Sequence, residues 1–294
     1  VEGLKICANV LIPSLFPFFV VSQMAVQTGM AAVVGRAFSK PMTWLFGLPG
    51  ACAPAFILGL FGGYPVGART AISIYEQGLC TKGEAERLLA FCNNSGPAFI
   101  LGAVGTMVFG TTAAGVLLYG SHVLASVIVG VLFRFYKRDK EQPIRGSIEA
   151  SPTIKAVPLT RAFITSVTGS FSSILNICAF VIFFSVAIRM LVVSGVLPAA
   201  ASLLATLMSP LGLSADLVQR LLSGLLEVTS GAYGLVSTPA GIGVKLSAAA
   251  FMLGWAGVSV HCQVLNFIGE SGLSALPYII GKLLHGGISA ALAY

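Results

Sequence analysis

Two amides, a hydroxyl group and a proline occur together inside one apolar stretch of this 294-residue chain. Asn93, Asn94, Ser95 and Gly96 directly precede Pro97, and a proline there removes an amide hydrogen and disrupts the preceding helical turn. A helix that begins near Pro97 would direct its positive end toward an anion. The motif therefore predicts a substrate-binding site at a break in a helix.

A second apolar stretch contains Ser259, His261 and Gln263. Alternating positions lie on one side of an extended chain, so these three polar groups can face one ligand. A histidine here could bind substrate or relay a proton. It could equally be a packing residue whose nitrogens are satisfied by neighbours, and the sequence leaves both interpretations open.

Two glycine-containing tips interrupt other apolar segments. Gly62, Gly63 and Tyr64 precede a proline, a combination that cannot continue a helix, and Arg69 follows. Exposed backbone groups with Tyr64 as a wall would suit a substrate, whereas close helix packing through small residues is the structural alternative. Arg69 at membrane depth must attract an anion or extend to the interface.

The second tip carries a carboxylate inside an apolar segment. Glu227 is followed by Thr229 and Ser230. A buried carboxylate must pair, coordinate a cation or take up a proton, so Glu227 is the candidate site for a coupling proton or Na⁺, while Thr229 and Ser230 offer oxygens to a cation or to substrate. A structural partner for a nearby donor is the alternative. No other cofactor and no metal site are expected.

The composition indicates lipid as the solvent of this chain. Charged residues are 9% of the sequence, against about 25% in a soluble domain. Seven of the 17 lysine and arginine residues fall in one polar connection, 134–161, which is typical of a cytoplasmic loop in a multi-pass membrane protein. This concentration argues against a nucleic-acid partner, and the dispersed cysteines suit packing rather than metal binding.

The chain consists of two similar halves. The string Leu4-Lys5-Ile6-Cys7-Ala8-Asn9-Val10 returns as Leu175-Asn176-Ile177-Cys178-Ala179-Phe180-Val181. We predict an all-α integral membrane protein with an inverted-topology repeat, two re-entrant helical hairpins and two broken transmembrane helices. Residues 1–134 form the first repeat, 135–158 a basic cytoplasmic linker and 159–294 the second repeat. Because the sequence starts at Val1, we leave open a preceding membrane helix.

Each half is expected to use the same order of elements. The first half contains a helix at 6–34, an interfacial segment at 36–49, a hairpin at 51–78, a broken helix at 84–109 and a closing helix at 112–133. Thr81 and Glu84 form a capping box at the start of the broken helix. The second half contains an amphipathic interfacial segment at 159–173, a helix at 174–196, a hairpin at 217–240, a broken helix at 246–268 and a closing helix at 273–293. Lys282 is assigned to the cytoplasmic boundary.

Several strings resemble the nucleoside-recognition (Gate) family, whose core is similar to that of concentrative nucleoside transporters. The resemblance covers nearly the whole chain and is closest to the members that act in sporulation. The strings are Pro13-Ser14-Leu15-Phe16-Pro17-Phe18-Phe19, Gly62-Gly63-Tyr64-Pro65, Asn94-Ser95-Gly96-Pro97-Ala98-Phe99, Glu227-Val228-Thr229-Ser230-Gly231 and Gly257-Val258-Ser259-Val260-His261-Cys262-Gln263.

The resemblance implies a secondary transporter, not an enzyme, that exports dipicolinic acid from the mother-cell cytoplasm during sporulation, in the cell membrane or outer forespore membrane. A nucleoside or another small metabolite is the alternative substrate. A non-transporting assembly factor for the spore envelope is the alternative class. The resemblance also leaves open a homo-oligomer, and the sequence identifies neither the substrate, the coupling ion nor the direction of transport.

Overall fold

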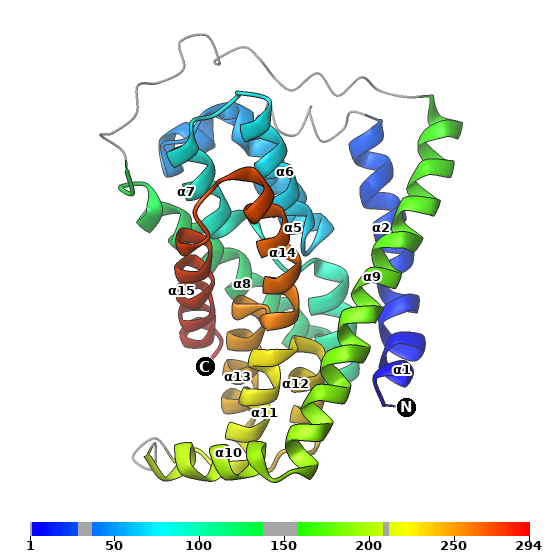
Figure 1. Ribbon diagram of the computed structural model, residues 1–294, viewed down its shortest axis with the longest axis vertical. Helices are drawn as coiled ribbons and strands as arrows, with labels where there is room; N and C mark the ends of the chain where they lie inside the picture. Colours follow the sequence, from blue (N-terminus) through cyan, green and yellow to red (C-terminus); the bar gives the residue numbers. More distant parts are fainter. Residues whose placement is uncertain (1, 29–36, 138–157, 208–211) are drawn as a thin grey trace.

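The computed structural model describes residues 2–28, 37–137, 158–207 and 212–294. Throughout these ranges the regular structure is helical and no strand occurs (Figure 1). Four of the described helices are long and apolar enough to cross a membrane, or five if a bent pair counts as one span. The prediction of an all-α multi-pass membrane protein is therefore confirmed for the described residues.

The first half runs from the N-terminus to the basic linker. Its elements are α1 (Glu2–Ile6), the π-helical turn η1 (Cys7–Leu11), α2 (Ile12–Gln27), α4 (Ser39–Pro41), η2 (Met42–Phe46), η3 (Gly50–Cys52), α5 (Ala53–Gly62), α6 (Val66–Glu76), α7 (Lys82–Cys92), the π-helix η4 (Ala98–Val108) and α8 (Thr112–Phe133).

The second half follows the linker, and most of the predicted linker lies outside the described residues. Its elements are α9 (Leu159–Val193), α10 (Val196–Leu207), α11 (Ala215–Leu226), α12 (Val228–Gly234), η6 (Leu235–Ser237), α13 (Ile242–Trp255), α14 (Val258–Ser271) and α15 (Leu276–Ala293). Figure 1 shows α10 lying across the lower end of the molecule.

One predicted element is wrong. The segment 159–173 is not a separate interfacial helix but the first part of α9, which has 35 residues and is therefore about 52 Å long. Part of its polar side faces α2, since the Thr165 hydroxyl donates to Gln27 at 2.6 Å. Ser166 and Ser170 are fully buried, whereas Thr168 and Ser172 are exposed, so tertiary contact accounts for some of the polar residues of this segment.

The two repeated strings face each other. α2 and α9 lie side by side and run in opposite directions (Figure 1), with Phe16 and Phe171 in edge contact at 6.3 Å between ring centroids. The Cys7 Sγ lies 3.8 Å from the carbonyl oxygen of Cys178. Because these cysteines occupy the same place in the two strings, equivalent positions of the two halves meet at this contact.

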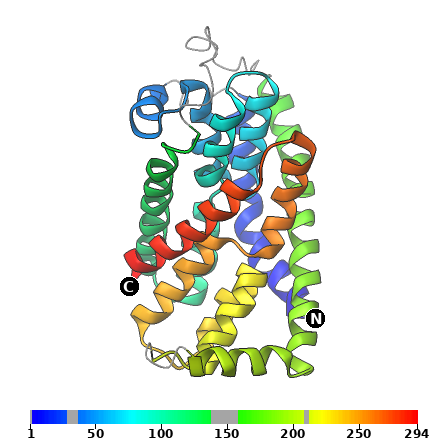
Figure 2. The same cartoon turned by 60° about the vertical axis from the view of Figure 1, so that its left-hand side comes forward.

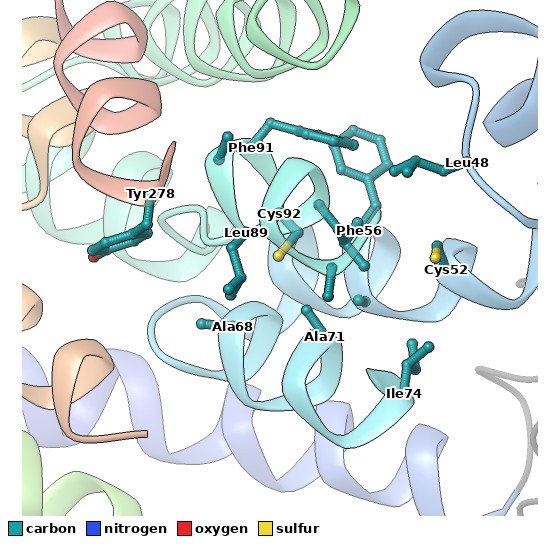
Figure 3. Close-up of a cluster of buried hydrophobic side chains, with 14 of the residues drawn as sticks. Leu48, Cys52, Phe56, Ala68, Ala71, Ile74, Leu89, Phe91, Cys92 and Tyr278 are labelled. Atoms are coloured by element: carbon teal, nitrogen blue, oxygen red, sulfur yellow. The ribbon is translucent and has the colours of Figure 1, made fainter. Parts of the chain in front are cut away.

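Two clusters of buried side chains hold the remaining helices together. The first joins α5, α6 and α7, with Phe56 and Phe91 at 5.4 Å between centroids, and Tyr278 of α15 reaches it from the side (Figure 3). The second joins η4, α8, α13 and the α2–α9 pair. Figure 2 shows α13 and α15 side by side, where Gly254 and Gly286 bring the two backbones into contact.

Polar contacts fasten one end of the molecule, shown at the top of Figure 1. The predicted capping box is confirmed, since Thr81 and Glu84 exchange both bonds at the start of α7. The fully buried Glu86 accepts hydrogen bonds from Lys137 at 2.7 Å and from the Ser274 amide at 3.0 Å. The bond to Glu86 raises the pKa of Lys137, so the pair stays ionised at neutral pH.

Candidate functional site

The first hairpin, α5 and α6, turns at Gly63 and packs directly on the end of α7. Gly63 has a positive φ of 73°, and a cis peptide bond joins Tyr64 to the next residue. A Cβ atom would lie 1.7 Å from the Cys92 carbonyl oxygen at Gly59 and 2.0 Å from it at Gly67. Only glycine permits this approach, so the hairpin and α7 meet backbone to backbone.

The first break, between α7 and η4, lies against that hairpin tip. Residues 93–96 have no helical structure, and a Cβ at Gly96 would lie 3.3 Å from the Gly63 amide nitrogen. The Asn94 side chain turns back to donate to the Phe91 carbonyl at 3.0 Å. The Ser95 amide donates to Nε2 of His122 at 3.0 Å. Side-chain and histidine contacts therefore replace the helical bonds that the break loses.

Glu227 is the N-cap of α12 in the second hairpin. Its carboxylate accepts the amide hydrogens of Thr229 at 2.8 Å and Ser230 at 2.6 Å, and the residue is 1% exposed. A carboxylate at a helix N-terminus is stabilised both by these bonds and by the helix dipole. The sequence predicted either a coupling site or a structural partner for nearby donors at Glu227. The two amide bonds fit the structural role, and the coupling role stays a prediction.

The second break, between α13 and α14, mirrors the first. Ala256 and Gly257 have positive φ angles of 82° and 85°. A Cβ at Gly257 would lie 3.1 Å from the Val228 amide nitrogen, so this break contacts the second hairpin tip as the first break contacts the first tip. The Tyr64 hydroxyl donates to the Leu253 carbonyl near the end of α13. This bond links the first hairpin to the second broken helix.

These elements surround a cavity of about 60 Å³. Leu15 and Val181, from the α2–α9 pair, form an apolar wall. The opposite wall carries eight of the predicted site residues: Gly63, Tyr64, Ser95, Gly96, Glu227, Thr229, Ser259 and Gln263. Residues far apart in the sequence thus meet at one place.

A larger cavity of about 690 Å³ adjoins the first one. Tyr64 and Gln263 line both, and the larger cavity extends along α6 as far as Gln77. Gly62 and Arg69 of the predicted site belong to it. The exposed Arg69 guanidinium lies 5.6 Å from the Phe267 ring centroid and makes no ion pair with a described carboxylate.

Four predicted residues line neither cavity. Asn93 and Asn94 are buried behind the first break. The Ser230 hydroxyl lies 3.3 Å from that of Ser185 in α9. His261 is buried between Trp255 and Tyr278, with Nδ1 2.9 Å from the tyrosine hydroxyl. Their predicted contact with substrate stays a prediction, and in the structure each of them packs behind the residues that line the cavity.

The sequence reasoning missed a polar group behind this wall. Lys282, assigned to the membrane boundary, is 1% exposed in the interior of the molecule. His122 and His285 are buried beside it, with ring centroids 4.2 Å apart. The available signal was the set of ionisable residues inside the two closing helices, because such residues are costly in a membrane and usually functional.

Helix N-termini and one carboxylate set the electrostatics of the cavity. Three helix N-termini border it, at Ala98 of η4, Val228 of α12 and Val258 of α14. The N-termini of η4 and α14 present amide groups with partial positive charge, whereas the first amides of α12 are bonded to Glu227. Glu227 is the one carboxylate among the described lining residues, and its charge is already bonded to two amides. Tyr64 offers an aromatic wall.

Comparison with known proteins identifies the class. Residues 8–114 match the family described as Gate, nucleoside recognition. The bundle and its internal cavity are those of a multi-pass membrane protein that carries this domain.

One relative shows the family more closely. The chain is 30% identical to the sporulation integral membrane protein YlbJ of Bacillus subtilis (strain 168), over 98% of this chain and 74% of that protein. The chain therefore belongs to the family of the sporulation integral membrane protein YlbJ.

Proposed function

We propose that this protein is a secondary transporter of a small anionic aromatic metabolite, and that the metabolite is dipicolinic acid exported from the mother-cell cytoplasm during sporulation. The observation that carries the proposal is the meeting of both hairpin tips and both helix breaks at one cavity. Dipicolinate is a flat ring with two carboxylates. The amides at the N-termini of η4 and α14 suit its carboxylates, and Tyr64 suits its ring.

The transport proposal includes an inverted repeat with two re-entrant hairpins. The order of helix, transverse segment, hairpin, broken helix and closing helix is the same in both halves. The contact between Cys7 and Cys178 supports an axis that relates the halves. Each hairpin tip contacts the break of its own half, an arrangement typical of transporters that bind substrate near the bilayer midplane.

The same proposal gives the cavity an orientation. The larger cavity extends along α6 to Gln77, and the chain then enters α7, whose first turns bond to Arg134 and Lys137. Basic residues mark the cytoplasmic side of membrane proteins, so substrate enters from the cytoplasm in this conformation. Glu227 carries the coupling proton or Na⁺. The mother-cell side or the outer forespore membrane is the corresponding location, and a homo-oligomer remains to be measured.

Nucleosides are the second candidate substrate, because the family that matches residues 8–114 is described as nucleoside recognition. The hydroxyl and amide groups of Ser95, Thr229, Ser259 and Gln263, which line the cavity, would suit a ribose and a base as well as a carboxylate. Charge separates the candidates, because a nucleoside gains nothing from an electropositive wall.

The proposal is tested with the purified protein in detergent and in proteoliposomes. Binding of dipicolinate and of uridine is measured by thermal shift between pH 5 and 8, and uptake of radiolabelled dipicolinate is measured in parallel. We expect a dipicolinate-specific shift that is lost in Tyr64→Leu and retained in the control Tyr294→Leu, because Tyr294 is exposed at the chain end. A thermal shift with uridine alone would identify nucleosides as the substrates. Binding of neither ligand would favour the spore-envelope assembly factor.

A further inference from the structure

Lys282 of α15 is a buried lysine without a described counterion. It is 1% exposed, and its Nζ donates to the Asn93 carbonyl at 3.0 Å. The same ammonium group lies 5.3 Å from the centroid of the Tyr64 ring. No described carboxylate forms an ion pair with it. The carbonyl at the end of α7 and the tyrosine ring stabilise the charge only in part.

The groups around Lys282 add no negative charge at neutral pH. His122 projects from α8 and His285 from α15, and Nε2 of His285 donates to the His122 carbonyl at 2.9 Å. Cys92 of α7, Tyr278 of α15 and His261 of α14 complete the surroundings. Burying an ammonium group without a counterion is costly, and such a group either loses its proton or is stabilised by a nearby anion. An anion bound near Lys282 would therefore stabilise its charged form.

The Tyr64 ring connects this cation to the cavity. Tyr64 lines the cavity wall and has the Lys282 ammonium 5.3 Å from its centroid. The break also links the two, because Asn93 holds Lys282 through its carbonyl while Ser95 and Gly96, two and three positions on, line the cavity. An anion bound beside Tyr64 would therefore lie within electrostatic reach of Lys282.

We propose that Lys282 determines the preference of the cavity for anions, by supplying from behind the Tyr64 ring and the first helix break the positive charge that a substrate carboxylate completes. This inference rests on the proposed function. Lys282 acts here as a positioning and selectivity residue that does not touch the substrate. The Lys282 ammonium lies 5.3 Å from the Tyr64 ring centroid, so a ligand carboxylate on the other face of the ring would be roughly 9 Å from it. With an effective dielectric constant of about 20, loss of the charge at that separation changes the affinity for one carboxylate about twentyfold.

The experiment compares a charged ligand with a neutral ligand of the same shape. Dissociation constants are measured for pyridine-2,6-dicarboxylate and pyridine-2,6-dicarboxamide with the wild type, Lys282→Met, Lys282→Arg and the control Lys245→Met. Lys245 lies at the far end of α13, where its ammonium group contacts the Val236 carbonyl. We expect Lys282→Met to weaken dicarboxylate binding twentyfold or more and to leave dicarboxamide binding within threefold. Lys282→Arg should restore the preference, and Lys245→Met should match the wild type.

The outcomes separate this inference from the function beneath it. Equal losses of affinity for both ligands in Lys282→Met would show that Lys282 serves packing alone and would overturn the inference. An unchanged preference for the dicarboxylate in Lys282→Met would overturn it too. In either case, dicarboxylate binding by the wild type would keep the proposed function. If the wild type binds neither ligand, the proposed function fails and the inference with it. If Lys282→Met does not fold, the wild-type ratio decides, because a preference for the dicarboxamide contradicts an anion-selective cavity.

Discussion

Replacement of Glu227 by glutamine should separate its structural role from its role in coupling. The glutamate carboxylate accepts two buried amide hydrogens, from Thr229 at 2.8 Å and from Ser230 at 2.6 Å. A glutamine side chain keeps one acceptor oxygen, but its NH₂ group would face the other amide. Glu227→Gln therefore exchanges a charged N-cap for a neutral one and leaves one buried donor without an acceptor.

The cost follows from these two bonds. An unsatisfied buried donor costs about 1–3 kcal/mol, and loss of charge from the remaining bond costs about 1 kcal/mol. We expect Glu227→Gln to lower the free energy of unfolding by about 2–4 kcal/mol. The matched control is Asp216→Asn in α11, where the carboxylate lies near the surface and pairs with Arg220 at 3.2 Å. That control should cost about 0–1 kcal/mol.

Two assays are read together for Glu227→Gln. Thermal unfolding in detergent reports the capping role, and dipicolinate uptake between pH 5 and 8 reports coupling. We expect the variant to unfold at a lower temperature and its uptake to be abolished or independent of pH. A normal Tm would refute the capping argument, whereas wild-type uptake with a wild-type pH response would refute the coupling role.

Three further perturbations test the packing around the site. Gly59→Ala should prevent folding or cost more than about 3 kcal/mol, because its Cβ would overlap a backbone carbonyl; Gly120→Ala, in α8 with nothing within 4 Å, should be neutral or stabilising by about 1 kcal/mol. Lys137→Met should cost about 1–2 kcal/mol because it removes the ion pair of the buried Glu86. Asn94→Ala should lower stability by about 1–2 kcal/mol and change substrate affinity less than threefold, because its side chain bonds to α7 and does not line the cavity.

Each of these expectations has a result that contradicts it. Thermal unfolding that ranks Gly59→Ala with Gly120→Ala would show that the hairpin does not pack on α7 as described. Equal melting temperatures for Lys137→Met and the exposed control Lys40→Met would show that the ion pair with Glu86 does not stabilise the protein. A large loss of dipicolinate affinity in a stable Asn94→Ala protein would place that amide in direct contact with the substrate.

The sequence predicts the order of the helices because length, apolarity and glycine–proline breaks are local properties. The helix at 112–133 is found with the same bounds, and the capping box at Thr81 is confirmed. The sequence predicted two elements in place of the long helix α9, because its Ser/Thr-rich first part, considered alone, is typical of a helix at the membrane interface. Only the contact with α2, through Gln27 and Thr165, shows why the polar face continues as one helix.

The sequence indicated many of the residues that line the cavity, but not the arrangement of the residues behind them. Glycines, Tyr64 and Glu227 stand out within apolar segments of the sequence. That they lie close together in the fold follows from the contact of each hairpin tip with a helix break. The orientation of Asn94 toward α7 and the burial of Lys282 depend on tertiary neighbours. A lysine near a helix end has the same local pattern whether it reaches water or lies against Tyr64, so its position alone did not distinguish the two.

The close approach of the first hairpin to α7 restricts how this molecule can move. Gly59 and Gly67 both touch the backbone at Cys92, with no side chain between them to rearrange. α5, α6 and α7 must then travel as a single rigid body, since sliding would drive backbone into backbone. Any change in access to the cavity has its hinge elsewhere, at the border with α2 and α9, where Leu15 and Val181 form the wall with side chains that can exchange rotamers.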